Sequence, residues 1–418
     1  MRKYINEGAK TSKIEKLYLK VNLLQFGPNG IECPQAGVHI DPWGRVDNAL
    51  LTHAHADHAR HGHRHYLAHS HNREVLRIRL GRNISLQTIE YGQAVHINGV
   101  RFSWHPAGHI PGSAQVRVEG AGQVWVVSGD YKTENDGFTP PFEPVSCSHF
   151  ITECTFGLPV YRWKPQELTA RELRNWLQEN GDSGHSTILY AYSLGKAQRL
   201  IHLLKDRFPL YVHPSIAEIN RALAGVGYPI PELPLIGQWK KSDKTPAVFV
   251  VPPGAAGAEQ AHQPATCREA SVSGWTLIRG MRRRQSLDNG FALSDHADWP
   301  GLLQAVKSTG AERIYCTHGF TAAFSRYLRE QGYHSSEVVT RFFGDATPDE
   351  TATIDVSESQ PEDVAETSAL NTPPTELPAM AEVAPPVDAS PPRAESTTPP
   401  LVPLRQANNH SREEGNTK

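Results

Sequence analysis

An α+β fold is predicted for this chain of 418 residues, because its first third and its middle carry different patterns of apolar residues. Short apolar runs separated by short loops follow one another from about residue 17 to residue 150, which is typical of strands that pair in sheets. The pattern then changes to strand, helix, strand, helix, which favours a small parallel α/β unit. A chain of this length has room for more than one domain.

The expected elements follow from the spacing of apolar residues along the chain. In the first pattern we expect short strands that end where polar residues begin: Ala49–Leu51, Val124–Val127 and, later in the chain, Arg313–Thr317. In the second pattern, amphipathic spacing predicts helices at 165–179, 195–206 and 215–224. The strands that we predict beside these helices are Thr187–Tyr192 and Leu210–Val212.

Four metal-ligating side chains lie within the six residues His53-Ala54-His55-Ala56-Asp57-His58, a segment that we call the ligand loop. An extended strand would direct His58 away from the other three side chains, so convergence requires a tight turn after His55. Imidazole and carboxylate both suit Zn²⁺, and four ligands with further partners exceed what one tetrahedral ion requires. The ligand loop therefore predicts two metal ions.

Histidine is abundant, with 21 in the chain, and five more follow the ligand loop within a short distance. These are His61, His63, His65, His69 and His71. We interpret them as a solvated histidine-rich tract rather than as metal ligands. The ligand loop differs from this tract because a carboxylate lies between its imidazoles.

Three further candidate ligands lie at the ends of predicted strands or in a loop. Asp130 follows the predicted strand Val124–Val127, which places its carboxylate at the mouth of a strand, where it can bridge two ions. His318 ends another predicted strand in the same way. His109 lies in a loop punctuated by Gly and Pro, which favours a fixed, irregular backbone. Singly each signal is weak, but together they supply the ligands that the loop lacks.

The composition excludes several classes of protein. The five cysteines are odd in number and form no Cys-x-x-Cys pair, so neither a disulfide framework nor a cysteine zinc site is indicated. We expect a reducing, cytoplasmic environment. We find no apolar core of a signal peptide at the N-terminus and no apolar run of the roughly 18 residues that a membrane span needs. We therefore expect no membrane partner.

The net charge of −2 divides unevenly along the chain. Residues 346–418 carry thirteen acidic and four basic side chains, which gives −9 for this segment and +7 for residues 1–345. The segment is rich in Pro, Ser, Thr, Ala and Glu and has no aromatic residue, so it cannot bury enough apolar surface to fold. We expect a disordered acidic tail behind a basic body that suits a nucleic-acid partner.

The ligand loop, His109 and Asp130, with Asp41 in an earlier turn, resemble the motif series of the metallo-β-lactamase superfamily. Three later motifs are similar to those of its β-CASP branch, whose members are nucleases acting on DNA or RNA: Thr152-Glu153, Ser294-Asp295-His296-Ala297-Asp298 and Thr317-His318-Gly319. Within the branch, the segments at 152–157 and 191–198 look most like the bacterial ligase-associated DNA exonucleases. The resemblance covers about residues 20 to 345.

The resemblance implies two Zn²⁺ ions, with Mn²⁺ or Fe²⁺ as alternative occupants. One zinc would be held by His53, His55, His109 and Asp130. The other would be held by Asp57, His58, His318 and the bridging Asp130. Such a pair of ions activates a water and stabilises the attacking and leaving oxygens of an in-line displacement at phosphorus. Asp41 would organise the ligand loop from behind rather than bind a metal.

The resemblance also gives catalytic roles to Asp57, Glu153 and His296. His296 would be the general acid that protonates the departing sugar oxygen, since an imidazole titrates near neutrality. Glu153 would orient His296 through a hydrogen bond, and Asp57 would act through the metals. The alternative for His296 is an ordinary loop histidine.

The domain organisation that the resemblance implies is an αβ/βα sandwich with an insertion. The metallo-β-lactamase domain would comprise residues 1–160 and 289–345, and the inserted parallel α/β β-CASP cap would comprise residues 161–288. Residues 346–418 would form the disordered tail. The two lobes would enclose a cleft over the metals, which is a usual place for a substrate site.

Two segments are candidates for holding the nucleic acid. Ser193, Gly195 and Lys196 join a predicted strand to a predicted helix, whose first N–H groups and dipole favour a phosphate. A serine cap followed by a glycine turn explains these residues almost as well. Arg282–Arg284 could contact the substrate backbone non-specifically, although a solvated surface run is the default interpretation of such a cluster.

We therefore expect a two-zinc phosphodiesterase, and by family analogy a 5′ to 3′ DNA exonuclease in end processing or repair. The expected partner is nucleic acid, DNA in preference to RNA, with a DNA ligase or a repair helicase as an associated protein. One alternative is an RNA-processing nuclease of the same branch, because the later motifs, His318 among them, also occur in RNA-cleaving members. Another is a non-catalytic module that clamps nucleic acid, against which the complete ligand set argues.

Overall fold

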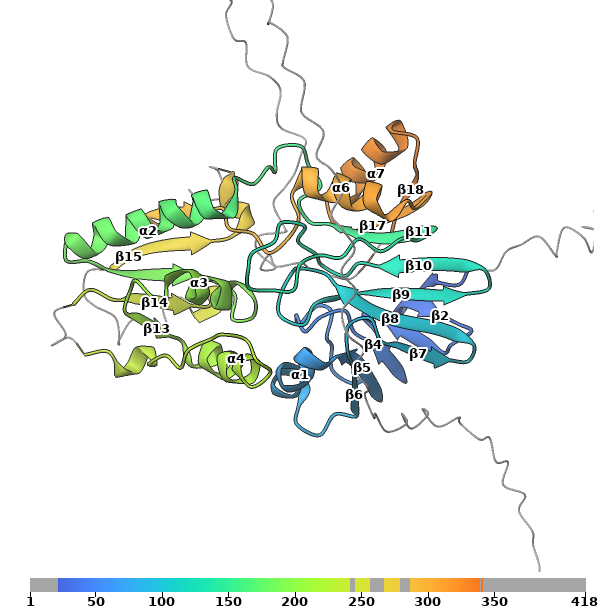
Figure 1. Cartoon of the computed structure of the whole chain (residues 1–418), viewed down its shortest axis with the longest axis horizontal. Helices are drawn as coiled ribbons and strands as arrows, with labels where there is room; N and C mark the ends of the chain where they lie inside the picture. The colour runs from blue at the N-terminus through green and yellow to red at the C-terminus, as the bar shows by residue number, and fades with distance from the viewer. Residues whose placement is uncertain (1–21, 241–244, 256–266, 279–285, 339, 341–418) are drawn as a thin grey trace, which may run out of the picture. The chain divides into compact units, whose positions relative to one another are not determined.

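Three β-sheets and six α-helices make up the part of the chain described by this computed structural model, residues 22–240, 245–255, 267–278, 286–338 and 340 (Figure 1). Two of the sheets mix parallel and antiparallel strands, and the third is parallel throughout. The α+β class predicted from the two strand patterns is confirmed.

The first sheet contains six strands in sequence order. They are β1 (Gln25–Gly27), β2 (Gly30–Cys33), β3 (Val38–Ile40), β4 (Asn48–Leu50), β5 (His65–His69) and β6 (Leu86–Ile89). Strands β3 to β6 are parallel, and helix α1 (Arg73–Leu80) makes the crossover between β5 and β6 that parallel pairing requires. The ligand loop lies between β4 and β5, at the carboxyl end of β4.

The second sheet contains seven strands in the order β18-β17-β11-β10-β9-β8-β7. They are β7 (Ala94–Ile97), β8 (Val100–Pro106), β9 (Ala114–Gly120), β10 (Gln123–Val127), β11 (His149–Cys154), β17 (Arg313–Gly319) and β18 (His334–Glu337). Because β11 pairs in parallel with both β10 and β17, the carboxyl ends of these three strands lie at the same edge of the sheet. Asp130, Glu153 and His318 all come from this edge.

The third sheet contains five parallel strands in the order β13-β14-β12-β15-β16. They are β12 (Ser186–Tyr190), β13 (Leu210–Val212), β14 (Val248–Val251), β15 (Cys267–Val272) and β16 (Asn289–Phe291). The helices that alternate with them include α2 (Gln166–Asp182), α3 (Lys196–Leu204) and α4 (Pro214–Ala224). The predicted parallel α/β unit is therefore present, with helix bounds within a few residues of those expected.

The first and second sheets pack face to face over a shared apolar core. Ile40 and Leu50 of the first sheet belong to one buried cluster with Trp104 and Trp125 of the second. Both tryptophans are wholly buried, and burial of a large apolar side chain contributes about 1.5–3 kcal/mol each. On the outer face of the second sheet, Phe150 packs with helices α6 (Trp299–Thr309) and α7 (Thr321–Glu330).

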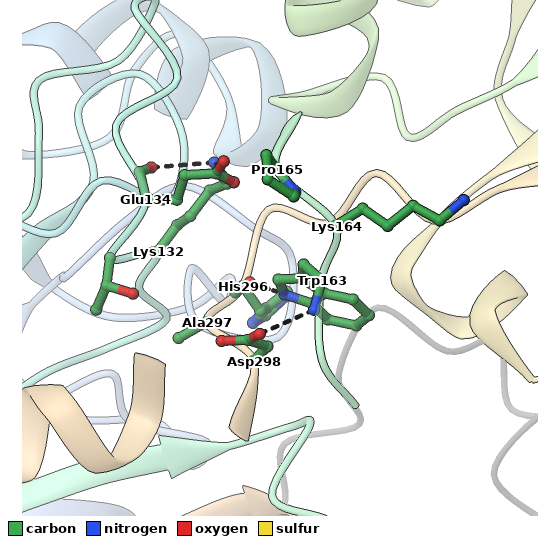
Figure 2. Close-up of a pocket in the computed structure, with 9 residues that line it drawn as sticks. Lys132, Glu134, Trp163, Lys164, Pro165, His296, Ala297 and Asp298 are labelled. Atoms are coloured by element: carbon green, nitrogen blue, oxygen red, sulfur yellow. Dashed lines mark hydrogen bonds and ion pairs between the residues drawn. The ribbon is translucent and has the colours of Figure 1, made fainter. Parts of the chain in front are cut away.

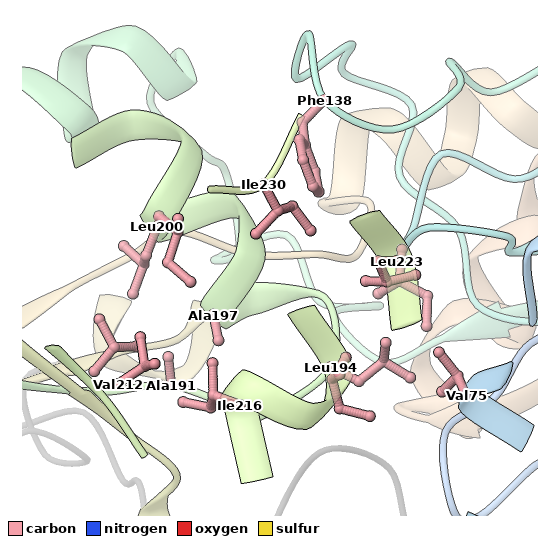
Figure 3. Packing of buried hydrophobic residues seen from close by; sticks show 14 of the residues in the cluster. Val75, Phe138, Ala191, Leu194, Ala197, Leu200, Val212, Ile216, Leu223 and Ile230 are labelled. Carbon is pink, nitrogen blue, oxygen red and sulfur yellow. The ribbon is translucent and has the colours of Figure 1, made fainter. Parts of the chain in front are cut away.

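A third cluster joins the outer face of the first sheet to the helices of the third. Ala49 and Leu51 belong to it, together with Val75 of α1 and Leu223 of α4. Figure 3 shows Val75 beside Leu223, in agreement with the contact between α1 and α4. Apolar burial thus continues from the first sheet into the parallel unit, which holds the two together independently of any polar contact.

Some of the sequence predictions fall outside the described residues. These are the basic run Arg282–Arg284 and the acidic segment 346–418. Within the part of the chain that is described, no helix is long and apolar enough to cross a membrane. The five cysteines all lie in this part and are thiols.

Candidate metal centre and its surroundings

The ligand loop turns sharply after His55. The backbone N–H groups of His58 and Ala59 both donate to the carbonyl of His55, at 3.2 and 2.8 Å. This is the turn that convergence of the four side chains requires. It buries His53, His55 and His58, whereas the side chain of Asp57 remains 16% exposed.

Four of the candidate ligands form a first cluster, whose ligand atoms all lie within 4.8 Å of one another: His53, His55, His109 and Asp130. The Nε2 atoms of His53 and His109 lie 3.5 and 3.7 Å from Oδ2 of Asp130. Nδ1 of His55 lies 3.1 Å from Nε2 of His109. Three imidazoles from two loops and one carboxylate from a third therefore converge on one point.

The remaining candidates form a second cluster on the other side of Asp130: Asp57, His58 and His318. Nε2 of His58 lies 3.7 Å from Oδ2 of Asp57 and 3.4 Å from Oδ1 of Asp130. The rings of His58 and His318 are stacked, with centroids 4.9 Å apart. Since Oδ2 of Asp130 faces the first cluster and Oδ1 the second, this carboxylate lies where a bridge between two ions must lie.

Asp130 reaches this position through a glycine in the left-handed region. Gly129 has φ 55°, and a Cβ there would lie 2.6 Å from the side chain of Thr52. Only glycine allows the chain after β10 to pass this close to the start of the ligand loop. The sequence pair Gly129-Asp130 is therefore explained by close packing against β4.

Glu153 and His296 form a buried pair beside the first cluster. Nδ1 of His296 lies 2.9 Å from both carboxylate oxygens of Glu153, and the side chains are 2% and 1% exposed. Backbone N–H groups of Tyr131 and Thr155 donate to the same carboxylate, at 2.8 and 3.3 Å. Glu153 is thus fixed by its own backbone contacts, and it fixes the orientation of the His296 ring in turn.

Asp41 connects the ligand loop to the turn after β3. Its Oδ2 lies 2.7 Å from Nδ1 of His58 and accepts from the hydroxyl of Thr52 at 2.5 Å, while Oδ1 accepts from the Thr52 amide at 2.8 Å. The same hydroxyl lies 3.0 Å from Nδ1 of His53. Asp41 therefore orients two imidazoles without contributing an atom to either cluster, which is the position expected from the sequence.

Two backbone carbonyls from distant segments orient the other imidazoles. Nε2 of His55 lies 3.1 Å from the carbonyl of Leu194, and Nδ1 of His109 lies 2.8 Å from the carbonyl of Asp295. A carbonyl can only accept, so each ring donates from that nitrogen. In the neutral rings, Nδ1 of His55 and Nε2 of His109 then face each other with lone pairs at 3.1 Å, an arrangement that a cation between them stabilises.

The electrostatics of the first cluster favour neutral imidazoles. Burial, with the neighbouring His296 and His55, lowers the pKa of His109 to about 3. Burial and the neighbouring His58 also hold the pKa of His53 well below its usual value, although Asp130 opposes the change. Metal ligation needs neutral imidazole, so these rings already have the protonation state that a metal requires.

The second cluster is more negative. Burial would lower the pKa of His58, but the carboxylates of Asp130, Asp57 and Asp41 outweigh it and hold the pKa well above its usual value. Burial would raise the pKa of Asp130, but His58 and His53 outweigh it and hold the pKa well below its usual value. Carboxylates gathered around one imidazole are the environment that a divalent cation neutralises.

The donor set also fits a metal in its hydrogen bonding. Within the described residues, Nε2 of His53 and Oδ1 of Asp130 are buried and make no hydrogen bond. Buried polar atoms in proteins are nearly always satisfied, so two such atoms aimed at the two clusters indicate a ligand of another kind. Imidazole and carboxylate together suit zinc, manganese and iron.

Comparison with known proteins gives relatives of two kinds. The chain is 28% identical over 307 residues to a protein named probable DNA ligase from Opitutus terrae, which is 73% of this chain and 30% of that protein. It is 30% identical over 123 residues to the endoribonuclease YSH1 of Saccharomyces cerevisiae, 29% of this chain and 16% of that protein. It is 28% identical over 139 residues to a ribonuclease of Thermus thermophilus, 32% of each.

The yeast and Thermus proteins are nucleases of the metallo-β-lactamase superfamily and its β-CASP branch. Over the matched residues, this chain resembles the nucleases of the β-CASP branch. Its matches span about a third or less of the length of each relative named here. No family model matches the chain.

A solved structure resembles this chain in fold alone. It is a protein of unknown function from Enterococcus faecalis, aligned with a TM-score of 0.51 over 70% of this chain and 79% of that one. The sequence identity over this alignment is 12%. The two proteins therefore share a mixed α+β architecture. At this sequence identity, the similarity says nothing about function.

Trp163 is one of the residues at the site that the sequence did not indicate. Trp163 donates from its indole Nε1 to the carbonyl of His296 at 3.0 Å, and its backbone N–H donates to Asp298 at 2.8 Å (Figure 2). It lines a pocket of about 250 Å³ with Lys132, Lys164 and the His296 segment. Because the acceptor is a backbone carbonyl, no motif could have indicated this contact.

Ser193, Gly195 and Lys196 have other partners than the phosphate expected of them. The Lys196 side chain is 2% exposed, and its ammonium lies 3.5 Å from Oδ2 of Asp295. Gly195 donates its N–H to the side chain of Gln198 at 2.7 Å, and the hydroxyl of Ser193 lies 3.1 Å from that of Ser215. The alternative of a capped helix start describes this segment better than a phosphate site does, with Gly195 rather than Ser193 as the cap.

The histidine-rich tract after the ligand loop is less solvated than expected. Among the described residues, none of its members belongs to a group of side chains that could hold a metal. However, His63 and His69 are buried, which corrects the prediction of a solvated tract. His69 lies at the end of β5 and stacks on Tyr91 at 3.6 Å between ring centroids, and burial lowers its pKa to about 3. His69 is buried because it belongs to β5, whereas His63 is buried in the loop before that strand, where it contacts Val46 and Tyr66.

Proposed function

We propose that this chain is a two-metal phosphodiesterase that cleaves nucleic acid. The observation that carries the proposal is the arrangement around Asp130. Its two oxygens face two separate groups of ligands, and the buried pair Glu153–His296 lies beside them. Two neighbouring ions can stabilise both the attacking and the leaving oxygen of an in-line displacement at phosphorus, which a single ion does less well.

We propose zinc as the native metal, with manganese as the alternative. The first ion would be held by His53, His55, His109 and Asp130, and the second by Asp57, His58, His318 and Asp130. When bound, two such ions supply Lewis acidity and lower the pKa of a water toward roughly 7. Asp57 is the most exposed of these ligands, so the attacking water would enter on its side.

In this proposal His296 protonates the leaving sugar oxygen. Its Nδ1 lies 2.9 Å from both carboxylate oxygens of Glu153, so we assign to Nε2 the proton that goes to the substrate. Glu153 keeps the ring oriented and stabilises the charged imidazolium. Trp163 holds the backbone of the same residue from the other side. The acid therefore has a fixed ring and a fixed main chain.

We further propose that the fold is a metallo-β-lactamase sandwich with a β-CASP cap. With the bounds expected from the sequence, residues 1–160 and 289–345 would form the first domain and residues 161–288 the cap, with strands β12 to β15 of the third sheet at its core. In the structure β16 (Asn289–Phe291) still pairs with β15, so the chain would return to the first domain just after Phe291. Domain insertion at this point brings His296 back to the metals.

DNA is the substrate that we propose, cleaved from the 5′ end. The support is that the relative named as a DNA ligase aligns with 73% of this chain, whereas the ribonucleases align with about a third or less. Ribonucleases nevertheless match, so RNA cleavage is the second candidate. A clamp without catalysis would not need the Glu153–His296 pair.

The test is hydrolysis of matched single-stranded DNA and RNA, each with a 5′-phosphate or a 5′-hydroxyl, by zinc-loaded protein. We expect mononucleotide release from the 5′ end of DNA and slower turnover of RNA. A clear preference for RNA would favour the second candidate. Asp57→Ala, with its zinc content measured, should abolish hydrolysis of both polymers, and full hydrolysis by that variant would contradict the two-metal mechanism.

A further inference from the structure

Four charged side chains are buried together between helix α3 and the loop that carries His296. They are Asp136, Lys196, Arg199 and Asp295, and we call them the charge cluster. Each is at most 2% exposed. Burying charges is costly even when they are paired, so a buried pair is weak evidence for a role in stability alone. A cluster of four at this place calls for another explanation.

Arg199 is the centre of the charge cluster. Its Nη1 lies 2.6 Å from Oδ1 of Asp295 and donates to the carbonyl of Ser294 at 2.7 Å. Its Nε and Nη2 lie 2.8 and 2.6 Å from Oδ2 of Asp136. Nη2 also donates to the carbonyl of His109 at 3.4 Å. Only the planar fork of arginine can make contacts in all of these directions, because lysine carries a single nitrogen.

The charge cluster touches the segments that orient two metal ligands of the first cluster. Asp295, held by Arg199 and Lys196 through its carboxylate, accepts from Nδ1 of His109 through its carbonyl. Leu194, two residues before Lys196, accepts from Nε2 of His55. The carbonyls that fix both rings therefore belong to segments that Arg199 and Lys196 hold.

The start of α3 is also packed directly against the His109 loop. Gly195 has φ +91°, and a Cβ there would lie 2.2 Å from the side chain of Ile110. The glycine lets the helix start approach Ile110, the neighbour of His109, without a side chain between them. Charged and apolar contacts therefore both hold the start of α3 close to the loop that carries His109.

We propose that the charge cluster is a positioning device for one of the two metals. Arg199 and Asp295 are positioning residues that hold the Leu194 and Asp295 carbonyls against His55 and His109. The start of α3 thereby contributes to the site of the first ion. This inference rests on the proposed two-metal function.

The second ion should be independent of the charge cluster. Its ligand His58 is oriented by Asp41, and Nδ1 of His318 lies 3.3 Å from the hydroxyl of its neighbour Thr317. Both contacts come from the first and second sheets. Damage to the charge cluster should therefore loosen one ion and leave the other in place, which general destabilisation of the protein would not do.

The test uses the zinc-loaded full chain and a competing chromophoric chelator, which measures the affinity of each of two zinc ions. The variants are Asp295→Asn, which removes one charge, and Arg199→Lys, which keeps the charge and loses the fork. Leu200→Ala, in the core of the same helix, is the matched control for lost stability. Thermal unfolding of every variant is measured in parallel.

We expect both variants to bind one zinc about 10–100-fold more weakly and the other as wild type does, the usual range when a partner behind a metal ligand is lost. Leu200→Ala should lower thermal stability and leave both affinities unchanged. Arg199→Lys, which retains the buried positive charge, provides the result if Asp295→Asn fails to fold.

Two outcomes would overturn the inference. Equal weakening of both ions, in proportion to the loss of thermal stability and matched by Leu200→Ala, would show that the charge cluster acts only on folding. Wild-type affinities in both variants would show that it does not position the ligands. A wild-type protein that takes up fewer than two zinc ions would instead contradict the proposed function from which the inference starts.

Discussion

Four imidazoles of the metal centre form two pairs that are oriented by residues at different distances along the chain. We call His53 and His58 the local half and His55 and His109 the distant half. His53 and His58 are oriented by Thr52 and Asp41, which lie at most 17 residues away. His55 and His109 are oriented by the carbonyls of Leu194 and Asp295, 139 and 186 residues away. The first pair can be oriented as soon as β3 and β4 are paired. Orientation of His55 requires Leu194 at the start of α3, and orientation of His109 requires the loop after β16 that carries Asp295.

This difference has a physical basis in the partners themselves. Asp41 offers a carboxylate, which also raises the pKa of His58 together with Asp130 and Asp57. Backbone carbonyls offer a fixed acceptor without a charge, and the pKa of His109 is left at about 3 by burial. The carboxylate of Asp41 orients His58 from a nearby part of the chain. The orientation of His55 and His109 depends instead on where the segments that carry the two carbonyls lie.

The largest effect that we expect comes from substitution of His296, the general acid that we propose. His296→Ala should lower kcat by about 10²–10⁴-fold, the usual contribution of general acid catalysis, because Nε2 no longer supplies a proton. Both zinc ions and substrate binding should remain. Single-turnover hydrolysis and metal analysis of the same sample measure these quantities.

His334→Ala, which removes an exposed histidine on β18, is the control for this experiment and should keep wild-type turnover. Near-normal turnover of His296→Ala would remove the residue from the mechanism. Loss of zinc from His296→Ala would show that the residue belongs to the metal centre itself.

A smaller effect is expected from the local half. Asp41→Asn should weaken the binding of both ions by about 10–100-fold. The amide has one acceptor oxygen, whereas the carboxylate uses two to bind His58, the Thr52 hydroxyl that contacts His53, and the Thr52 N–H. The same zinc competition measures it. Asp295→Asn should therefore weaken the binding of one zinc ion, whereas Asp41→Asn should weaken the binding of both.

Asp47→Asn, at an exposed aspartate in the same segment, should change neither affinity. If Asp41→Asn instead weakened a single ion, the contact through Thr52 would have no influence on His53. The local half would then consist of His58 alone.

The smallest effect is expected at Trp163. Trp163→Phe keeps the ring and removes the N–H that donates to the His296 carbonyl. A neutral hydrogen bond contributes about 0.5–1.5 kcal/mol, so kcat should fall by at most about tenfold while KM and zinc content stay unchanged. Steady-state kinetics with Trp176→Phe, in helix α2, as the control would measure it. A change in KM alone would place Trp163 in substrate binding instead.

The sequence indicated the candidate ligands that converge in the structure, but it did not indicate most of the groups that orient them. Asp57 and His58 were found because four ligands in six residues form a local pattern, and Asp130 because it follows a strand. The Leu194 and Asp295 carbonyls were missed because every residue has a carbonyl, so no residue type indicates one. Only the packed structure reveals which carbonyl meets which ring.

Local chemistry also misled the interpretation of charge. Lys196 at a helix start suggested a phosphate site, but its ammonium is buried against Asp295. The sequence places the two residues 99 positions apart, and nothing in either segment indicates the other. Long-range ion pairs of this kind depend on how distant segments pack together, which the periodicity of apolar residues does not indicate.

The most direct test of the account is the location of bound metal. Anomalous diffraction at the zinc edge from crystals of the zinc-loaded protein should give two peaks per chain. One should lie among His53, His55, His109 and Asp130, and the other among Asp57, His58, His318 and Asp130. A single peak, or peaks away from Asp130, would contradict the two-metal centre.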